Sequence, residues 1–362
     1  MSNIFRELLK KVGSGVHTGK DLSRQEAAIA TQMMLEAEAT PAQIGAFLIA
    51  HRIKRPTSEE LAGMLDAYEQ IGPMLQPLSS ADREFAHPVT VLGTPYDGRS
   101  RTAPVTPITA LILATAGVPV LMHGSDCMPT KYGVPLIELW QGLGLNFAKL
   151  SVLQIQQLLQ TTGLGFIYLP QHFSEAQSLV TYRDQIGKRP PLATMELIWS
   201  PYAGNLHIVA GYVHPPTESR FQNTFDLRGV DNYTLVKGLE GSLDLPRERT
   251  AIIALSQPAA EFGFERLLLH PRDYGFAGTD VPLESTPQLL AQLQEVLAGK
   301  PSELMTSAVW NGGFYLWRCG ICSDLYTAFA QAEALLMEGA VGEKLEEVKL
   351  AIASLQLAHQ SV

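Results

Sequence analysis

The chain has 362 residues, of which 46% are hydrophobic and 17% charged, so it can bury a large core as one large domain or two unequal ones. Its formal net charge of −9 argues against a general nucleic-acid binder, although a local basic groove can form on an acidic protein. Three cysteines are too few for a disulfide framework, and we see neither a signal peptide nor an apolar run of membrane-spanning length, so we expect a cytoplasmic protein without membrane contact.

Residues 1–75 are predicted to be entirely helical. Ser23 and Glu26 have the spacing of a capping box, and Thr40 and Thr57 are residue types that begin two further helices. Four short helices bury too little apolar surface to be stable alone. We therefore expect a small domain that packs on the rest of the chain and serves as a homodimer interface.

A larger domain is predicted over residues 85–362, after a connector rich in proline and serine. Short apolar or β-branched runs bounded by glycine and proline indicate its strands. These runs cover residues 89–92, 118–122, 165–169, 207–213, 232–236, 251–255 and 266–270, and the last two could form an antiparallel pair around 258–263. A helix at 172–187 could join the helical domain. The predicted fold class is α/β: a small N-terminal all-helical domain, then a larger α/β domain with a mostly parallel central sheet and C-terminal helices.

The loop after the first predicted strand is the best candidate for a binding site. Thr106, which precedes a proline, is predicted to be the N-cap of a helix through its side-chain oxygen, and the unpaired N–H groups at a helix N-terminus favour anions. Gly93 and Gly98 let the backbone approach a ligand, and Arg99 and Arg101 add positive charge suited to phosphate. These features predict a phosphate or pyrophosphate site. The alternative is an ordinary surface crossover with solvated arginines, because the standard glycine-rich fingerprints are absent.

Three blocks of sequence carry a resemblance to a known family: LLKKVGSGVHTGKDLSRQEA near the start, then HPRDYGF, then AVWNGGFYLWRCGICSDLYTAFAQAEALLMEG. In this order they resemble the anthranilate phosphoribosyltransferases and their relatives in glycosyltransferase family 3, over nearly the whole chain. The resemblance implies a small α domain joined to a larger α/β domain, a homodimer formed through the α domain, and a cleft for phosphoribosyl pyrophosphate between the domains. It also implies an enzyme that transfers the phosphoribosyl group, a pentosyl unit, to an acceptor.

The substrate-binding motifs of that family are altered here. The family's Gly-Thr-Gly-Gly-Asp-Gly is GTPYDG at 93–98, and its Asn-Ile-Ser-Thr is APVT at 103–106. Its Lys-His-Gly-Asn is MHGS at 122–125, and its Ser-Ser-Lys-Ser-Gly is PTKYG at 129–133. Its acidic motif for magnesium, His-Gly-x-Asp-Gly-Leu-Asp-Glu, is KGLEGSLD at 237–244. These changes imply altered or weak activity.

The positions that match the family's motifs receive candidate roles. The resemblance implies that phosphoribosyl pyrophosphate contacts Gly93, Thr94, Asp97, Gly98, Arg99, Arg101, Thr106 and Lys131. It places His123, Ser125, His172 and Arg183 on the acceptor side, with Arg183 matching the arginine that holds the anthranilate carboxylate. His123 is the candidate catalytic residue, and the alternative is a hydrogen-bonded loop histidine. A degraded Mg²⁺ site would use Asp244 and Glu240.

A second hypothesis is a non-catalytic binder of nucleic acid or nucleotide in the same cleft. The chain resembles a diverged branch of the family with a tyrosine and an arginine in the loop, as in Tyr96-Asp97-Gly98-Arg99, and some members of that branch bind nucleic acid. One groove could be lined by Arg99, Arg101, Lys131, Arg183, Lys188 and Arg189, with Tyr96 and Tyr132 as stacking surfaces. From the sequence we narrowly favour a transferase of changed specificity over this binder.

Overall fold

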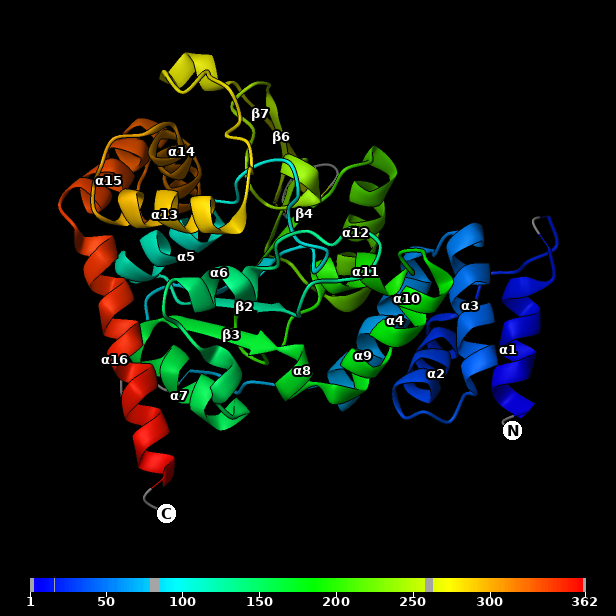
Figure 1. The fold of residues 1–362 in the computed structure, drawn as a ribbon. Coiled ribbons are helices and arrows are strands. Elements are labelled where there is room, and N and C mark those ends of the chain that lie inside the picture. Colours follow the sequence, from blue (N-terminus) through cyan, green and yellow to red (C-terminus); the bar gives the residue numbers. More distant parts are fainter. Residues whose placement is uncertain (1–2, 16, 79–84, 258–262, 361–362) are drawn as a thin grey trace.

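The computed structural model describes residues 3–15, 17–78, 85–257 and 263–360. A helical layer formed by the N-terminal part of the chain lies beside a larger α/β body (Figure 1). Helix α16, Ala340–Gln360, runs along the side of the α/β body that is remote from the helical layer (Figure 1). This arrangement confirms the predicted fold class.

The helical layer begins with α1 Asn3–Gly13, α2 Arg24–Leu35, α3 Pro41–Lys54 and α4 Ser58–Ile71. The predicted capping box of α2 is confirmed, because the Ser23 side chain accepts from the N–H of Glu26 and the Glu26 carboxylate accepts from the N–H of Ser23 at 2.8 Å. Thr40 and Thr57 cap α3 and α4 in the same way. Side chains three residues away therefore decide where these helices begin.

A seven-stranded sheet with the order β3-β2-β1-β4-β5-β6-β7 forms the centre of the α/β body. Its strands are β1 Val89–Gly93, β2 Val120–Gly124, β3 Leu164–Tyr168, β4 Leu206–Gly211, β5 Tyr233–Val236, β6 Ala251–Ser256 and β7 Phe264–Leu269. The neighbouring strands β3, β2, β1, β4 and β5 pair in parallel, whereas β6 pairs antiparallel with both β5 and β7. The predictions of a mostly parallel sheet and of an antiparallel pair formed by the last two strands are therefore confirmed. The predicted turn at 258–263 falls largely outside the described residues. Every residue of β1 and β2 is buried, as expected for strands covered on both faces.

Helices cover the sheet, and the C-terminal helices form a group beside it (Figure 1). The longer ones are α5 Thr106–Thr115, α6 Leu136–Gly142, α7 Val152–Thr162, α12 Pro215–Arg228, α13 Thr286–Leu297, α14 Glu303–Arg318 and α15 Leu325–Met337. Short pieces are α11 Leu192–Met195, η1 Phe147–Lys149, η2 Glu196–Ile198, η3 Leu239–Gly241 and η4 Pro271–Tyr274. Helix α5 is buried from Thr106 to Ala114 and packs against α14 and α16. Because α5 joins the parallel strands β1 and β2, its N-terminus lies at the carboxyl edge of the sheet.

The single helix predicted at 172–187 is wrong. The structure has three short helices there: α8 Leu169–His172, α9 Ser174–Ser178 and α10 Val180–Ile186. Phe173 interrupts them with a φ of −147° and a ψ of 67°. Its buried ring packs edge-on against Tyr68 of α4, with the ring centroids 5.1 Å apart, and tilted against Trp199 at 5.7 Å. Burying this ring at the junction breaks the helix, and the segment packs against α2 and α3 as part of the helical layer (Figure 1).

Candidate functional site

The candidate site lies where the parallel strands end and their following loops meet. Gly93 closes β1 so near to η2 that a Cβ atom there would lie 1.9 Å from the Leu197 carbonyl oxygen. Gly98 has a φ of +70°, and a Cβ atom there would lie 2.3 Å from the Val134 carbonyl oxygen. Both glycines are needed because the backbone of another segment of the chain packs closely against each of them. The loop that contains them is therefore folded inward and does not lie open for a ligand.

Tyr96 and His123 form a buried pair on the inner side of this loop. The Tyr96 hydroxyl lies 2.6 Å from Nδ1 of His123, and the His123 ring packs on Trp199 with the centroids 5.0 Å apart. Burial lowers the pKa of His123 to about 4, so its imidazole is neutral at physiological pH. The expectation that Tyr96 offers a stacking surface is wrong, because its ring is only 4% exposed. The geometry of His123 matches the alternative interpretation, a hydrogen-bonded histidine.

Asp97 neutralises the arginine expected to hold the acceptor. Its buried carboxylate forms ion pairs with both Arg183 and Arg189. Arg183 also donates from Nε to the Pro129 carbonyl at 3.2 Å. Glu196 lies close to both arginines, and burial raises its pKa to about 7 while the two guanidinium charges oppose that rise. A free acceptor carboxylate would have to compete with Asp97 for Arg183.

Arg99 is likewise held by residues of the chain. Nη1 of Arg99 donates to Ser242 Oγ and to Asp244 Oδ2, both at 2.8 Å, and its Nη2 donates to the Thr102 hydroxyl. Nε donates to Glu240 at 3.3 Å. The residue is only 3% exposed. Arg99 thus joins the loop after β1 to the loop after β5, and its charge is already balanced.

The N-terminus of α5 has an internal anion in place of the predicted side-chain cap. Thr106 is the first helical residue and not the N-cap, and Val105 occupies the N-cap position without a side-chain hydrogen bond. Asp244 takes over the capping role: its Oδ2 accepts from the Val105 N–H at 3.1 Å, and its Oδ1 accepts from the Thr106 hydroxyl at 2.8 Å. The favourable position for an anion at this helix is therefore filled by a carboxylate 138 residues along the chain from Thr106.

Glu240 fills a second anion position. Its carboxylate accepts hydrogen bonds from the N–H groups of Ser100 at 3.2 Å and of Arg101 and Thr102 at 3.0 Å each. Nζ of Lys131 lies 2.9 Å from the same carboxylate. Burial alone would raise the pKa of Glu240, but the hydrogen bond and charge of Lys131 and the charge of Arg99 hold it well below its ordinary value. Lys131, expected to bind substrate phosphate, is therefore also paired internally.

The two predicted metal ligands do not fit a magnesium site as they are arranged. Mg²⁺ requires near-octahedral coordination by oxygens that are free to face it. Each carboxylate oxygen of Asp244 and Glu240 already accepts hydrogen bonds, and Arg99 lies against both groups. Among the residues that the structure describes, no three His, Cys, Asp or Glu side chains are grouped so that they could hold a metal ion.

The remaining predicted site residues Thr94, Ser125 and His172 are buried or bonded within the protein. Ser125 donates to the Gln177 side chain at 2.6 Å, and Thr94 is buried beside the loop. Nδ1 of His172 accepts from the Tyr168 N–H at 2.9 Å, and its Nε2 lies 2.7 Å from the Leu150 carbonyl. Both ring nitrogens of His172 are thus used by the backbone. The structure does not present this side chain to an acceptor.

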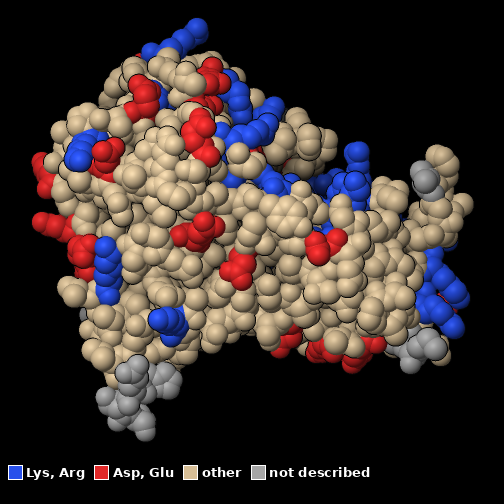
Figure 2. All heavy atoms as spheres, in the orientation of Figure 1, with Lys and Arg blue, Asp and Glu red and all other residues tan. Residues whose placement is uncertain are grey.

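An open groove of about 850 Å³ lies between the helical layer and the α/β body. Four arginines line it: Arg52, Arg55, Arg189 and Arg220. Among the described residues that line it, Glu240 is the one carboxylate. Figure 2 shows Lys and Arg side chains gathered along the upper side of the molecule where the two parts meet. Arg52, Arg55 and Arg220 were not predicted as site residues, although the basic run HRIKRP at 51–56 carries a signal for the first two.

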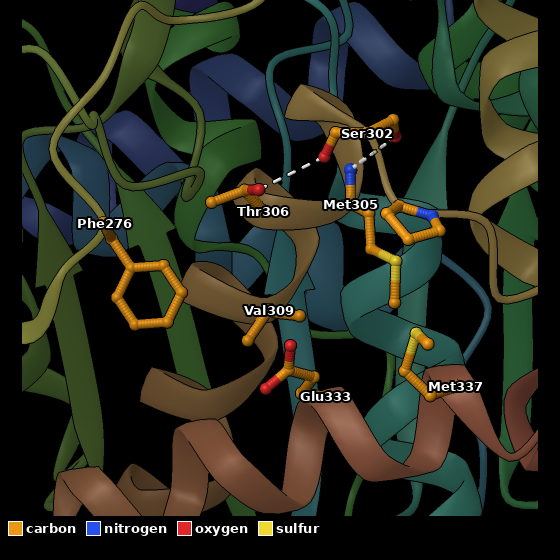
Figure 3. A pocket seen from close by; sticks show the side chains of 8 residues that line it. Phe276, Ser302, Met305, Thr306, Val309, Glu333 and Met337 are labelled. Carbon is orange, nitrogen blue, oxygen red and sulfur yellow. Dashed lines mark hydrogen bonds between the residues drawn. The ribbon is translucent and has the colours of Figure 1, made fainter.

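A smaller cavity of about 180 Å³ lies among the C-terminal helices, between α14 and α15 (Figure 3). Phe276, Met305 and Met337 give it an apolar lining, and Glu333 is the one charged residue among the described lining residues. None of the predicted site residues lines it. The basic groove is therefore the better candidate for a functional surface.

The fold defines a class of two-part proteins in which a helical layer is joined to an α/β body with a groove between them. Comparison with known families shows which family of this class the chain belongs to. Residues 6–71 match the helical bundle domain of the glycosyl transferase family and residues 87–341 match its a/b domain, so the chain belongs to this family. The expected family resemblance is thereby confirmed. Within the described residues, no helix is both long and apolar enough to cross a membrane.

The relatives found in these comparisons include anthranilate phosphoribosyltransferases. The chain is 28% identical over 349 residues to that of Rhodopseudomonas palustris (strain BisB18), covering 96% of this chain and 97% of the relative. It is 25% identical to an uncharacterized protein of Aquifex aeolicus, covering 91% and 98%. In fold it is similar to the Saccharomyces cerevisiae anthranilate phosphoribosyltransferase in complex with PRPP and Mg, with a TM-score of 0.81 and 15% identity over 98% and 99% of the chains. The Thermus thermophilus enzyme has a TM-score of 0.76 and 18% identity, over 97% and 100%.

Proposed function

We propose that this chain binds single-stranded nucleic acid in the basic groove and does not transfer phosphoribose. From the sequence alone we favoured a transferase over a nucleic-acid binder, and this proposal reverses that order. The supporting observation is a division among the cations. Arg99, Lys131 and Arg183, the cations expected to bind substrate, are held by carboxylates of the chain itself. Of the four arginines that line the open groove, Arg189 also pairs with Asp97, whereas Arg52, Arg55 and Arg220 form no ion pair with a carboxylate of the described residues.

The chemistry of the groove suits a chain of phosphates. Arg52 and Arg55 come from the C-terminal end of α3 and are exposed, and Arg220 comes from α12, close enough to Arg55 for their charges to interact. Guanidinium groups bind phosphate oxygens through paired donors, and contacts of this kind give affinity without base specificity. Tyr132, which is 64% exposed, offers a ring for stacking beside the loop. A local cluster of this kind can act on a protein whose net charge is negative.

Phosphoribosyl transfer is the second candidate, and the fold is the observation that favours it. The yeast relative with the same fold is in complex with PRPP and Mg, and this chain retains Gly98, Thr106 and Lys131 at matching positions. Binding of the same substrate here would require Asp244 to leave the N-terminus of α5 and Glu240 to leave Lys131. The internal ion pairs make that exchange unfavourable.

Titration of a fluorescent single-stranded oligonucleotide, followed by anisotropy at several salt concentrations, tests the proposal. We expect affinity to fall steeply between about 50 and 200 mM salt, because each phosphate contact releases counterions. Arg52→Ala, Arg55→Ala and Arg220→Ala should each weaken binding and reduce the salt slope by roughly 0.7. Arg272→Ala is the matched control, because Arg272 is an exposed arginine outside the groove.

Calorimetry with phosphoribosyl pyrophosphate, with and without Mg²⁺, separates the two candidates. Micromolar binding that depends on the metal, together with no oligonucleotide binding at low salt, would overturn the proposal in favour of transfer. Salt-dependent oligonucleotide binding that the groove variants weaken and the control does not would support it.

A further inference from the structure

The cavity between α14 and α15 combines an apolar lining with a single charge. Four side chains supply most of its apolar surface: Phe276, Met305, Val309 and Met337. In Figure 3 the Phe276 ring lies on one side and the two methionine side chains on the other, with the Glu333 carboxylate between them. An apolar cavity of about 150 Å³ can hold benzene. At about 180 Å³, this cavity is large enough for a ring with a short polar chain.

The other polar groups of the lining already have partners within the protein. Ser302 is the N-cap of α14, and its Oγ accepts from the Met305 N–H at 3.1 Å. The Thr306 hydroxyl donates to the Ser302 carbonyl at 3.1 Å. The Glu333 carboxylate, by contrast, forms neither a hydrogen bond nor an ion pair with any residue that the structure describes. Glu333 is therefore the polar group of this lining that is left for a ligand.

Two cations next to the lining are paired with other carboxylates. Arg247 donates from Nε to the Phe276 carbonyl at 2.9 Å, and its Nη1 lies 2.9 Å from Glu303. Lys300 precedes the lining residue Pro301 in the chain, and its Nζ lies 3.7 Å from Glu295. Neither cation takes up the charge of Glu333. The cavity consequently has an unbalanced negative charge at one point of an apolar surface.

This arrangement selects a particular class of ligand. An apolar body gains free energy by displacing water from the lining, and one polar group fixes its orientation. An ammonium group can pair with Glu333 and is also attracted to the face of an aromatic ring such as that of Phe276. The thioethers of Met305 and Met337 make favourable contacts with an aromatic ligand. An anionic ligand of the same size would be repelled by Glu333.

We propose that this cavity binds a small organic ammonium ion with a compact aromatic body, and that Glu333 holds the ammonium group. The site goes beyond the proposed binding of nucleic acid, because the cavity and the basic groove share no described lining residue. The two proposals can therefore succeed or fail independently.

Titration with 2-phenylethylammonium, followed by NMR of the protein labelled with ¹³C in its methionine methyl groups, locates the site. The methyl signals of Met305 and Met337 should shift with a dissociation constant on the order of 0.1–1 mM, as expected for a ligand of this size. They should also show nuclear Overhauser effects to the phenyl protons. Met305→Leu and Met337→Leu assign the two signals. Met33 and Met34 of α2 are internal references that should not shift. No change at Met305 and Met337 up to about 10 mM ligand would overturn the proposal.

The role of the charge is tested with a neutral ligand of the same shape. Glu333→Gln should weaken binding of 2-phenylethylammonium by about three- to fivefold, as expected for a partly exposed ion pair, and should leave binding of 2-phenylethanol unchanged. Glu338→Gln is the matched control, because Glu338 is an exposed glutamate at the end of the same helix and does not line the cavity. Equal weakening in the two variants, or tighter binding of phenylacetate than of 2-phenylethylammonium, would overturn the assignment of an ammonium site.

Discussion

Arg99 and Asp244 form a buried ion pair that joins two loops at the carboxyl edge of the sheet. Nη1 of Arg99 lies 2.8 Å from Oδ2 of Asp244, and their side chains are only 4% and 1% exposed. Asp244 also caps α5 through Val105 and Thr106. One carboxylate therefore holds both the cation and the helix terminus that the sequence assigned to a substrate phosphate.

Replacing Arg99 with alanine should destabilise the protein strongly. Arg99→Ala leaves the buried carboxylates of Asp244 and Glu240 without a countercharge, and losing one partner of a buried pair costs about 3–5 kcal/mol. Chemical denaturation measures the free energy of unfolding. Arg272→Ala, which removes an exposed arginine beside Asp273, should change it by less than about 0.5 kcal/mol. A loss of less than about 1 kcal/mol in Arg99→Ala would show that the pair is not buried in solution.

Gly98→Ala should cost more than the same change at a glycine of similar backbone conformation. Gly98 has a φ of +70° and its Cβ would collide with the Val134 backbone, whereas Gly229 has a φ of +67° and no atom within 4 Å of the Cβ position. Gly229→Ala should therefore cost only the left-handed strain, about 1–2 kcal/mol, and Gly98→Ala should cost that plus the collision. Urea denaturation of both variants gives the comparison. Equal losses would mean that the loop after β1 is more open than described.

The Tyr96 hydroxyl should contribute to stability through His123. Tyr96→Phe leaves the buried Nδ1 without its partner at 2.6 Å, which should cost about 1–3 kcal/mol in the free energy of unfolding. Tyr132→Phe removes an exposed hydroxyl that lies 3.2 Å from Asp184 and should have little effect. Thermal and chemical denaturation of the two variants measure the difference. If both changes are neutral, the Tyr96 hydroxyl has access to water.

Glu196 should make the stability of the protein depend on pH. Burial raises its pKa from 4.5 to about 7, opposed by the charges of Arg183 and Arg189, so the folded state binds its proton more tightly than the unfolded state. The stabilisation that comes from this tighter proton binding by folded Glu196 is fully present below pH 4.5 and is lost as the pH rises through about 7. Tyr68 and Tyr96 also face this group, but their pKa values are raised by burial and they stay protonated in that range.

Comparison of Glu196→Gln with the unmodified chain isolates this contribution. The difference in unfolding free energy between the two proteins should change across this pH range, because only the unmodified chain carries the titrating group. The pH dependence that comes from His123 is common to both proteins and cancels. A difference that is constant with pH would show that Glu196 ionises normally in the folded state.

Much of the fold could be predicted from the sequence because its signals are local. The side chains of Ser23, Thr40 and Thr57 begin α2, α3 and α4 through atoms three residues away, and short β-branched runs bounded by breakers became the strands of the sheet. The antiparallel end of the sheet followed from two such runs close together in the chain. Phe173 marks where this reasoning failed, because tertiary burial of its ring outweighed the local helical preference.

The sequence by itself determined the family, the order of the elements and the presence of a charged loop after β1. The tertiary structure alone decided which charges meet. Arg99, Lys131 and Arg183 each had the residue type of a phosphate or carboxylate binder, and each is paired with Asp244, Glu240 or Asp97. The physical reason is that an ion pair depends on distance in space and on exclusion of water, and the carboxylate partners of Arg99 lie 141 and 145 residues away along the chain.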